Sequence, residues 1–248
     1  MSVFVIGDLH LSTNQTTNKS MEVFGKRWTG YLQKLESNWD AVVEDKDTVI
    51  IPGDISWAMR LDEAVEDLKW LNRRPGVKLI GKGNHDFWWS THRKMQAFFD
   101  EHHLDSLRIL YNNAYVVEDQ IVCGTRGWFL DEHQQITVGE ADYQRIVARE
   151  VIRLKLSLDE AKKLQTEHAE STGAVLPIVV YLHFPPLWQN FCCREFVDMF
   201  HAYDIRRCYF GHIHGSYVQE GRTLFEEISF SLVSSDFLKF SPLPVSVR

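Results

Sequence analysis

In the first part of the chain, short, mainly apolar runs alternate with longer stretches in which apolar residues recur at helical spacing. Short apolar runs indicate buried strands, and recurrence at i, i+3 and i+4 indicates helices. The predicted strands lie at 3–6, 48–51 and 77–80, and the predicted helices lie at 28–42, 61–71 and 91–103. This order predicts β-α-β-α units with parallel strands.

The second part of the chain is richer in strands. They are predicted at 108–111, 115–117, 121–123, 176–182, 208–210, 223–228 and 231–233. A loop from about 125 to 139 precedes a helical stretch from about 140 to 170. We predict a single layered α/β domain, 1–248, with more than one sheet. The segment at about 125–170 is either a cap or dimer element, or an amphipathic helix that packs on the body.

Composition and charge narrow the function classes. Of the 248 residues, 44% are hydrophobic and 25% are charged, which excludes disordered and collagen-like chains. The formal net charge of -7 argues against an extended nucleic-acid surface. Membrane association is not expected, because the sequence has neither a long apolar run nor a signal-peptide pattern. The four cysteines do not form the pattern of a secreted disulfide framework, so we expect a cytoplasmic protein.

Five polar segments each follow directly on an apolar run. They are Gly7–His10, Pro52–Asp54, Gly81–Asp86, His183–Pro186 and Gly211–Gly215. Because sites collect at the carboxyl ends of strands in α/β sheets, we expect these segments to lie together. Each segment alone is compatible with an ordinary turn or a structural histidine, and only their joint occurrence indicates a site.

Together the five segments supply four imidazoles, two carboxylates and one amide oxygen. The residues are Asp8, His10, Asp54, Asn84, His183, His212 and His214. This set is large enough for two divalent ions that share one carboxylate. It holds nitrogen and oxygen donors without a thiolate, which suits manganese, iron or zinc better than a cysteine-rich structural zinc site.

The ordered series GDxH, GD, GNHD, H and GHxH resembles the calcineurin-like metallophosphoesterase superfamily from residue 5 to residue 215. The Gly124–Trp128 segment and the helix after it are similar to a small group of bacterial predicted phosphohydrolases in that superfamily. The resemblance implies the metallo-dependent phosphatase fold, a four-layer αββα sandwich of two mixed sheets flanked by helices.

The resemblance also implies a role for each motif residue. It assigns Asp8, His10 and His214 to one ion, Asn84, His183 and His212 to the other, and Asp54 to both. His85 would contact the substrate phosphoryl group or protonate the leaving oxygen, and Asp86 would orient His85. The implied cofactors are two divalent ions, with Mn²⁺ favoured and Fe, Zn²⁺ or a mixed pair as alternatives.

Other polar and aromatic residues are candidate substrate contacts. Tryptophans occur in or near three of the five segments and in the Gly124–Trp128 loop, and Trp88 and Trp128 are the ones we predict to contact substrate. The alternative is ordinary packing beneath the loops. Arg126 lies in a glycine-flanked loop and is predicted to bind substrate phosphate, unless it is simply a surface arginine.

These observations together predict a binuclear phosphoesterase that acts on a small phosphate ester. Hydroxide formed between the two ions would attack phosphorus in line, without a covalent enzyme intermediate. A phosphodiester or nucleotide-type substrate is favoured over a monoester, including a phosphoprotein. Two other hypotheses are weaker. An inactive scaffold would lack ligands, whereas all seven are present. A DNA exonuclease of this superfamily would add a capping domain, and only 34 residues follow His214.

Overall fold

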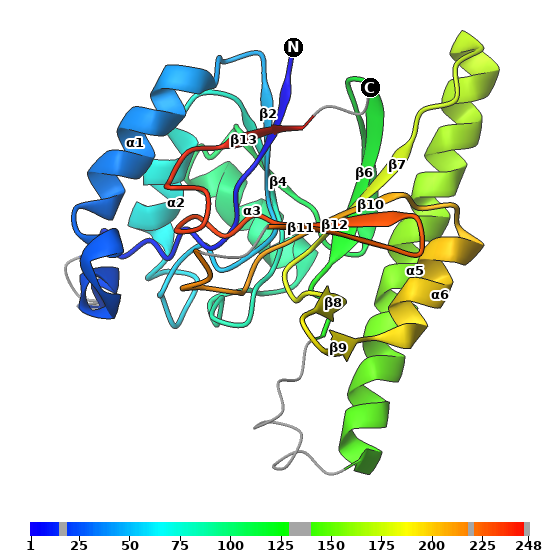
Figure 1. Cartoon of the computed structure of the whole chain (residues 1–248). Coiled ribbons are helices and arrows are strands. Elements are labelled where there is room, and N and C mark those ends of the chain that lie inside the picture. Colours follow the sequence, from blue (N-terminus) through cyan, green and yellow to red (C-terminus); the bar gives the residue numbers. More distant parts are fainter. Residues whose placement is uncertain (15–18, 129–139, 218–220, 246–248) are drawn as a thin grey trace.

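The computed structural model describes residues 1–14, 19–128, 140–217 and 221–245. Two mixed β-sheets pack face to face, and helices cover both outer faces (Figure 1). This arrangement confirms the predicted four-layer αββα sandwich.

The first sheet has the strand order β13-β1-β2-β3-β4. Its strands are β1 (Val3–Val5), β2 (Thr48–Ile51), β3 (Val77–Ile80), β4 (Leu107–Ile109) and β13 (Leu243–Val245). Strands β1 to β4 are parallel, and β13 pairs antiparallel with β1. Its outer face carries α1 (Tyr31–Val42), α2 (Val65–Asn72) and α3 (His92–Glu101). Two short 3-10 helices, Met21–Phe24 and Lys26–Trp28, precede α1.

The second sheet has the strand order β11-β12-β10-β7-β6-β5. Its strands are β5 (Asn113–Val117), β6 (Gln120–Thr125), β7 (Ile178–Leu182), β10 (Arg207–Phe210), β11 (Arg222–Phe225) and β12 (Ile228–Leu232). The four central strands are parallel, and the two edge strands run antiparallel. Helices α5 (Glu140–Thr172) and α6 (Arg194–Ala202) cover its outer face, and β8 (Leu187–Trp188) pairs with β9 (Phe191–Cys192).

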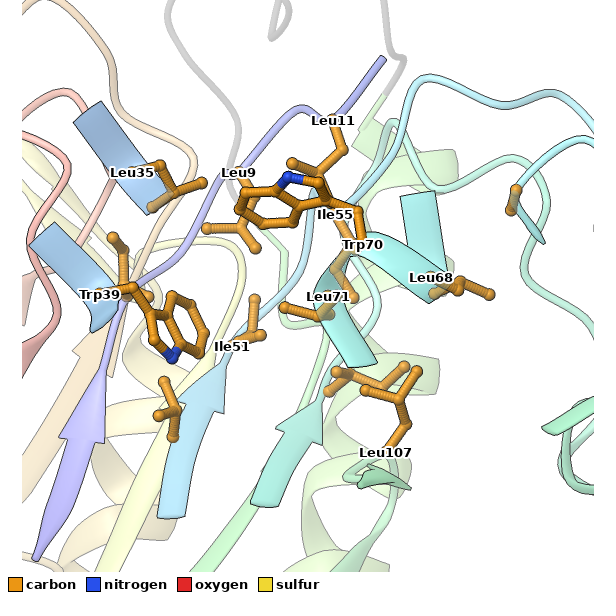
Figure 2. Close-up of a cluster of buried hydrophobic side chains, with 14 of the residues drawn as sticks. Leu9, Leu11, Leu35, Trp39, Ile51, Ile55, Leu68, Trp70, Leu71 and Leu107 are labelled. Carbon is orange, nitrogen blue, oxygen red and sulfur yellow. The ribbon is translucent and has the colours of Figure 1, made fainter. Parts of the chain in front are cut away.

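Alternation along β1 shows how the sequence specifies these layers. Val3 and Val5 lie between the two sheets, in one cluster with Val179 of β7. Phe4 and the following Ile6 join the opposite cluster, under the helices. Because successive side chains of a strand point to opposite faces, a fully apolar strand fills both layers at once. Figure 2 shows the helix-side cluster, where residues of α1 and α2 close over the end of β2.

Some elements were not predicted from the sequence. They are α6, the short pair β8–β9, and β13, which contains a proline at the edge of its sheet. The strand predicted at 223–228 is instead one arm of a hairpin, in which Glu226 and Glu227 form the turn with φ of 46° and 64°. Neither residue is a glycine or asparagine, so the usual sequence signal of a tight hairpin turn is missing.

Helix α5 packs on the body of the molecule. Its residues Val147, Leu154, Leu158 and Ala161 are buried in the core on the outer face of the second sheet. This agrees with the amphipathic alternative for the helix. The loop at 129–139, which belongs to the possible cap, lies outside the described residues. Within the described part of the chain, not even α5 has the apolar stretch that a membrane-spanning helix needs.

The loops that follow the parallel strands meet at one edge of the sandwich. Asp8 N donates to Gly53 O at 3.0 Å and His10 N donates to Asp54 O at 2.9 Å, which joins the loops after β1 and β2. In the second sheet, Gly211 N donates to His183 O at 3.1 Å and joins the loops after β10 and β7. The fold therefore brings the polar segments of the sequence to a single place.

Candidate metal centre

Several residues of these loops have a left-handed backbone. The φ angles are 57° for Asp8, 46° for His10, 52° for Asp54 and 70° for His212. Non-glycine residues seldom adopt this conformation, which costs roughly 1–2 kcal/mol each. Such strain persists only where the surroundings impose it, so its presence in four motif residues fits a functional site.

Two glycines let the carboxylates approach the neighbouring loops. A Cβ atom on Gly211 would lie 2.3 Å from Oδ2 of Asp8, and one on Gly83 would lie 2.0 Å from Oδ1 of Asp54. Any side chain at either position would push the carboxylate away. The glycines of the third and fifth segments therefore fit the two carboxylates into the site.

Asp8, His10 and His214 form the first ligand group. Their ligand atoms lie within 4.8 Å of one another. The Nε2 atoms of His10 and His214 are 3.1 Å apart, and His214 Nε2 is 3.8 Å from Oδ1 of Asp8. Two imidazole nitrogens at this separation fit adjacent positions around one divalent ion, because metal–nitrogen bonds are about 2.0–2.1 Å long.

The second ligand group surrounds Asn84. Its Oδ1 lies 2.6 Å from Nε2 of His183 and 3.0 Å from Nδ1 of His212. Asp54 Oδ2 is 3.6 Å from the same nitrogen of His183. The structure thus brings together all four residues that the resemblance assigns to the second ion and the shared position.

Asp54 lies between the two groups. Its Oδ2 is 3.8 Å from Nε2 of His10 in the first group and 3.6 Å from Nε2 of His183 in the second. Its Oδ1 accepts a hydrogen bond from the backbone N of His85 at 2.8 Å. One oxygen is therefore anchored to the loop, and the other faces both groups.

The electrostatics of the site fit a bound cation. Asp8 and Asp54 are buried, and no lysine or arginine in the described residues forms an ion pair with either of them. Burial raises the pKa of Asp8 to about 6, and burial together with the Asp86 and Asp8 carboxylates raises that of Asp54 well above its usual value. Burial and the neighbouring imidazoles lower the pKa of His10 and His183. Buried carboxylates without a lysine or arginine partner, next to imidazoles of lowered pKa, match the needs of divalent ions.

Asp236 is a site residue that the sequence did not reveal. Its Oδ1 lies 2.8 Å from Nδ1 of His214, and its Oδ2 accepts hydrogen bonds from Gly215 N at 3.0 Å and Tyr217 Oη at 2.9 Å. A carboxylate on the outer nitrogen of a metal-ligating histidine fixes the tautomer and orientation of the ring. The available signal was its place just after the strand at 231–233, because the other motifs also follow strands.

Replacing Asp236 by asparagine is expected to weaken metal binding. Asp236→Asn keeps the size of the side chain but removes the charge that supports His214. We expect an affinity loss of about 10–100-fold at one ion position, measured by titration of metal-free protein with Mn²⁺. Tyr217→Phe is the matched control, because it removes one hydrogen bond to Asp236 and leaves the carboxylate in place. Equal affinity in Asp236→Asn and wild type would contradict a supporting role.

Asp86 lies in the site but does not orient His85. Its carboxylate is buried and accepts hydrogen bonds from Gly83 N, Asp54 N and the indole of Trp88, at 2.7, 2.9 and 3.0 Å. It also accepts from the backbone N of Ile55 and Ser56. These donors occupy both oxygens, and no hydrogen bond to the His85 ring is present among the described residues. The expected role is therefore corrected: Asp86 fixes the backbone of the loop that carries Asp54.

His85 stands beside the ligand groups, half-exposed. Its ring centroid is 4.5 Å from that of Trp57 and 5.6 Å from that of His10. Trp57 in turn stacks on His10, with ring centroids 4.9 Å apart and an interplanar angle of 22°. The indole therefore positions both imidazoles, and His85 can meet a substrate held at the ligand groups.

The predicted substrate contacts lie in different surroundings. The expected contact does not hold for Trp88, which is only 2% exposed and turns its indole inward to Asp86. Trp128 is half-buried, and its ring centroid is 5.5 Å from that of Phe184. Arg126 is not a free surface residue, because it forms an ion pair with the buried Glu150 at 3.2 Å. Its side chain remains near the site, beside Phe184.

Comparisons with known proteins give a family match and similar folds. A model of the calcineurin-like phosphoesterase family matches residues 1–216. The fold is similar to the protein TT1561 of Thermus thermophilus, with a TM-score of 0.56 and 9% identity over 99% of this chain and 98% of that chain. It is also similar to the phosphopantetheinyl hydrolase of Mycobacterium tuberculosis, with a TM-score of 0.51 and 16% identity over 100% and 96% of the two chains. A protein of unknown function from Aquifex aeolicus has a TM-score of 0.50 and 14% identity, over 98% and 95%. No curated protein matches the sequence significantly.

Proposed function

The chain belongs to the calcineurin-like phosphoesterase family, and we propose that it is a binuclear metal-dependent hydrolase of small phosphate esters. The first ion would be held by Asp8, His10 and His214, the second by Asn84, His183 and His212, and both by Asp54. The observation that carries this proposal is the position of Asp54 Oδ2, 3.8 Å from His10 and 3.6 Å from His183. Mn²⁺ is the favoured ion, with Fe, Zn²⁺ or a mixed pair as alternatives.

The residues around the metal ligands would bind the substrate, donate a proton and hold the ligands in position. When bound, two divalent ions would supply positive charge for the phosphoryl oxygens and lower the pKa of a water molecule. His85 contacts the phosphoryl group or donates a proton to the leaving oxygen. Trp57 holds the His85 ring in place, and Asp86 and Asp236 hold the loops and rings that carry the ligands. No side chain acts as a covalent nucleophile.

An organic group on both sides of the phosphorus fits the surface next to the site. Phe87, which directly follows Asp86 in the third loop, is 57% exposed. A pocket of about 430 Å³ opens beside His214 and is lined by Trp188, Gln189 and Tyr217 among others. Exposed aromatic rings on two sides of the ligand groups favour a phosphodiester or nucleotide-type substrate over a simple monoester.

Hydrolysis of two chromogenic esters tests this proposal. Metal-stripped protein with Mn²⁺ added back is assayed with bis(p-nitrophenyl) phosphate and with p-nitrophenyl phosphate. We expect Mn²⁺-dependent turnover that favours the diester. Preference for the monoester would make the protein a phosphomonoesterase. The basic residues around Arg126 would then explain the binding of a phosphate group with two negative charges. Absence of turnover with two ions bound per chain would contradict the proposed activity.

A further inference from the structure

A cluster of basic side chains lies next to the candidate metal centre and has no part in holding the metals. It consists of Lys82 after β3, Arg126 after β6, and Arg149 and Arg153 one turn apart on α5. Arg126 Nη2 and Arg153 Nη1 both bind Oε1 of Glu150, at 3.2 and 2.5 Å. We call these four cations the basic cluster.

The basic cluster carries a surplus of positive charge. Burial and the charges of Arg126 and Arg153 lower the pKa of Lys82, and burial raises the pKa of Tyr111 against the opposing charges of Arg153, Arg126 and Arg149. Glu150, which is fully buried, is the one carboxylate that the described residues place in ion pairs with these arginines. Lys82 also faces the Asp86 carboxylate, so four cations share two anions, and the surplus of positive charge forms a local site for anions in a chain of net charge -7.

The basic cluster is linked to the ligand groups through Phe184. The Phe184 ring centroid is 4.5 Å from that of His212 and 5.0 Å from that of His183. The guanidinium of Arg126, a member of the basic cluster, lies 5.8 Å from the centroid of the same ring. Arg126 O also accepts hydrogen bonds from His183 N and Phe184 N, at 3.1 and 2.9 Å. The distance from the ligand groups to the basic cluster is thus spanned by one aromatic side chain.

Arg126 keeps hydrogen-bonding capacity for a ligand. Its side chain is 19% exposed, and its buried Nε has no hydrogen-bond partner in the described part of the chain. Its one ion pair uses Nη2 and shares Oε1 of Glu150 with Arg153. A guanidinium has five N–H donors in a fork that matches phosphate oxygens. Glu150 therefore holds Arg126 in place without using up its donors.

We propose that the basic cluster binds a second phosphate of the substrate, one that is not hydrolysed. The inference rests on the proposed function and extends it to a substrate class, organic molecules that carry two phosphates. The scissile phosphate would lie at the ligand groups, the connecting organic part would span the distance between the two sites, and the second phosphate would meet Arg126, Arg153 and Lys82. Charge-assisted, forked hydrogen bonds from arginine make such a contact strong and directional.

Binding of inorganic pyrophosphate to metal-free protein tests the basic cluster without relying on catalysis. Arg126→Met and Arg153→Met are compared with wild type by titration calorimetry at low salt. We expect the Kd to rise at least about tenfold in each variant, since one charge-assisted contact is worth roughly 1.5–3 kcal/mol. Arg206→Met is the matched control, because Arg206 also pairs with carboxylates, those of Asp204 and Glu227. It precedes β10 and so lies at the amino end of that strand, whereas the ligand loops follow the carboxyl ends. Unchanged Kd values in both cluster variants would overturn the inference.

Inhibition of the Mn²⁺-loaded protein separates this inference from the proposed function. Adenosine 3′,5′-bisphosphate and adenosine 5′-monophosphate compete with hydrolysis of bis(p-nitrophenyl) phosphate. We expect the bisphosphate to inhibit wild type at least about tenfold more strongly than the monophosphate. Arg126→Met should lose this preference, and Arg126→Lys, which keeps the charge but not the forked donors, should retain part of it. Equal inhibition by both nucleotides in wild type would refute the second-phosphate contact. If no ester is hydrolysed, the proposed function fails and the pyrophosphate titration still decides the basic cluster.

Discussion

Asp54→Asn is expected to have the largest effect of any single substitution on metal binding. The substitution keeps the shape of the side chain and an oxygen that can accept from His85 N, but it removes the charge that lies between the two ligand groups. Both ions should therefore bind more weakly, by more than about 100-fold, because even supporting carboxylates contribute 10–100-fold. Hydrolysis should fall with the metal content.

The same substitution is expected to stabilise the metal-free protein. Burial, and then the carboxylates of Asp86 and Asp8, raise the pKa of Asp54. A carboxyl with a raised pKa in the folded state keeps its proton to higher pH than in the unfolded state, so the folded state is penalised once the group ionises. The penalty is nearly absent at pH 4, grows as the pH rises above the ordinary pKa of an aspartate, and is complete once the pH exceeds the folded-state pKa. Asp54→Asn should thus raise the free energy of unfolding clearly more at pH 8 than at pH 4.

Two measurements check these opposite effects. Elemental analysis after loading with Mn²⁺ and dialysis gives the number of ions per chain, and denaturant unfolding of metal-free protein at pH 4 and pH 8 gives the stability. Asp67→Asn serves as a control, because Asp67 is also a buried carboxylate but bonds to Thr13 and Ser56 rather than to the ligands. Two tightly held ions in Asp54→Asn would show that the carboxylate does not bridge.

His85→Ala is expected to slow hydrolysis by about 10²–10⁴-fold while both ions stay bound. His85 is not among the ligand groups, and its ring instead packs on Trp57 and His10. If His85 protonates the leaving oxygen, the loss should be large for a poor leaving group and smaller for a good one. Diphenyl phosphate should therefore lose far more rate than bis(p-nitrophenyl) phosphate.

The comparison of leaving groups is decisive for the role of His85. His92→Ala, at an exposed histidine that begins α3, controls for the loss of an imidazole elsewhere. An equal rate loss for both esters would assign His85 to phosphoryl contact rather than to proton donation. Loss of bound Mn²⁺ in His85→Ala would instead make His85 part of the metal site, against its position here.

The parts of the site that the sequence predicted are those encoded locally. Asp8, Asp54 and Asn84 each follow an apolar run in a parallel sheet, and parallel strands place their carboxyl ends at one edge. Gly83 before Asn84 and Gly211 before His212 have a visible reason, since side chains there would strike Asp54 and Asp8. Strand, glycine and ligand are therefore adjacent in the chain, and a short segment is enough to recognise them.

Partnerships formed across the fold could not be predicted in this way. Asp236 lies 22 residues after His214, outside every motif, and reaches it from the connection between β12 and β13, a strand that was not predicted. Asp86 was predicted to orient its neighbour His85, but its oxygens accept hydrogen bonds from backbone N–H groups of the loop after β2. A buried N–H group needs an acceptor, and the three-dimensional arrangement of the loops is required to see which carboxylate supplies it.

The division of the ligands between the two sheets gives bound metal a mechanical role. Asp8, Asp54 and Asn84 come from loops of the first sheet, and His183, His212 and His214 come from loops of the second. Ions bound by both sets of ligands would cross-link the two sheets at this edge, where the apolar interior of the sandwich ends. Because such ions bind only the folded chain, a higher free metal concentration would lower the population of states in which the two sheets separate at this edge. Chelation would therefore allow local opening of the edge before global unfolding of the core.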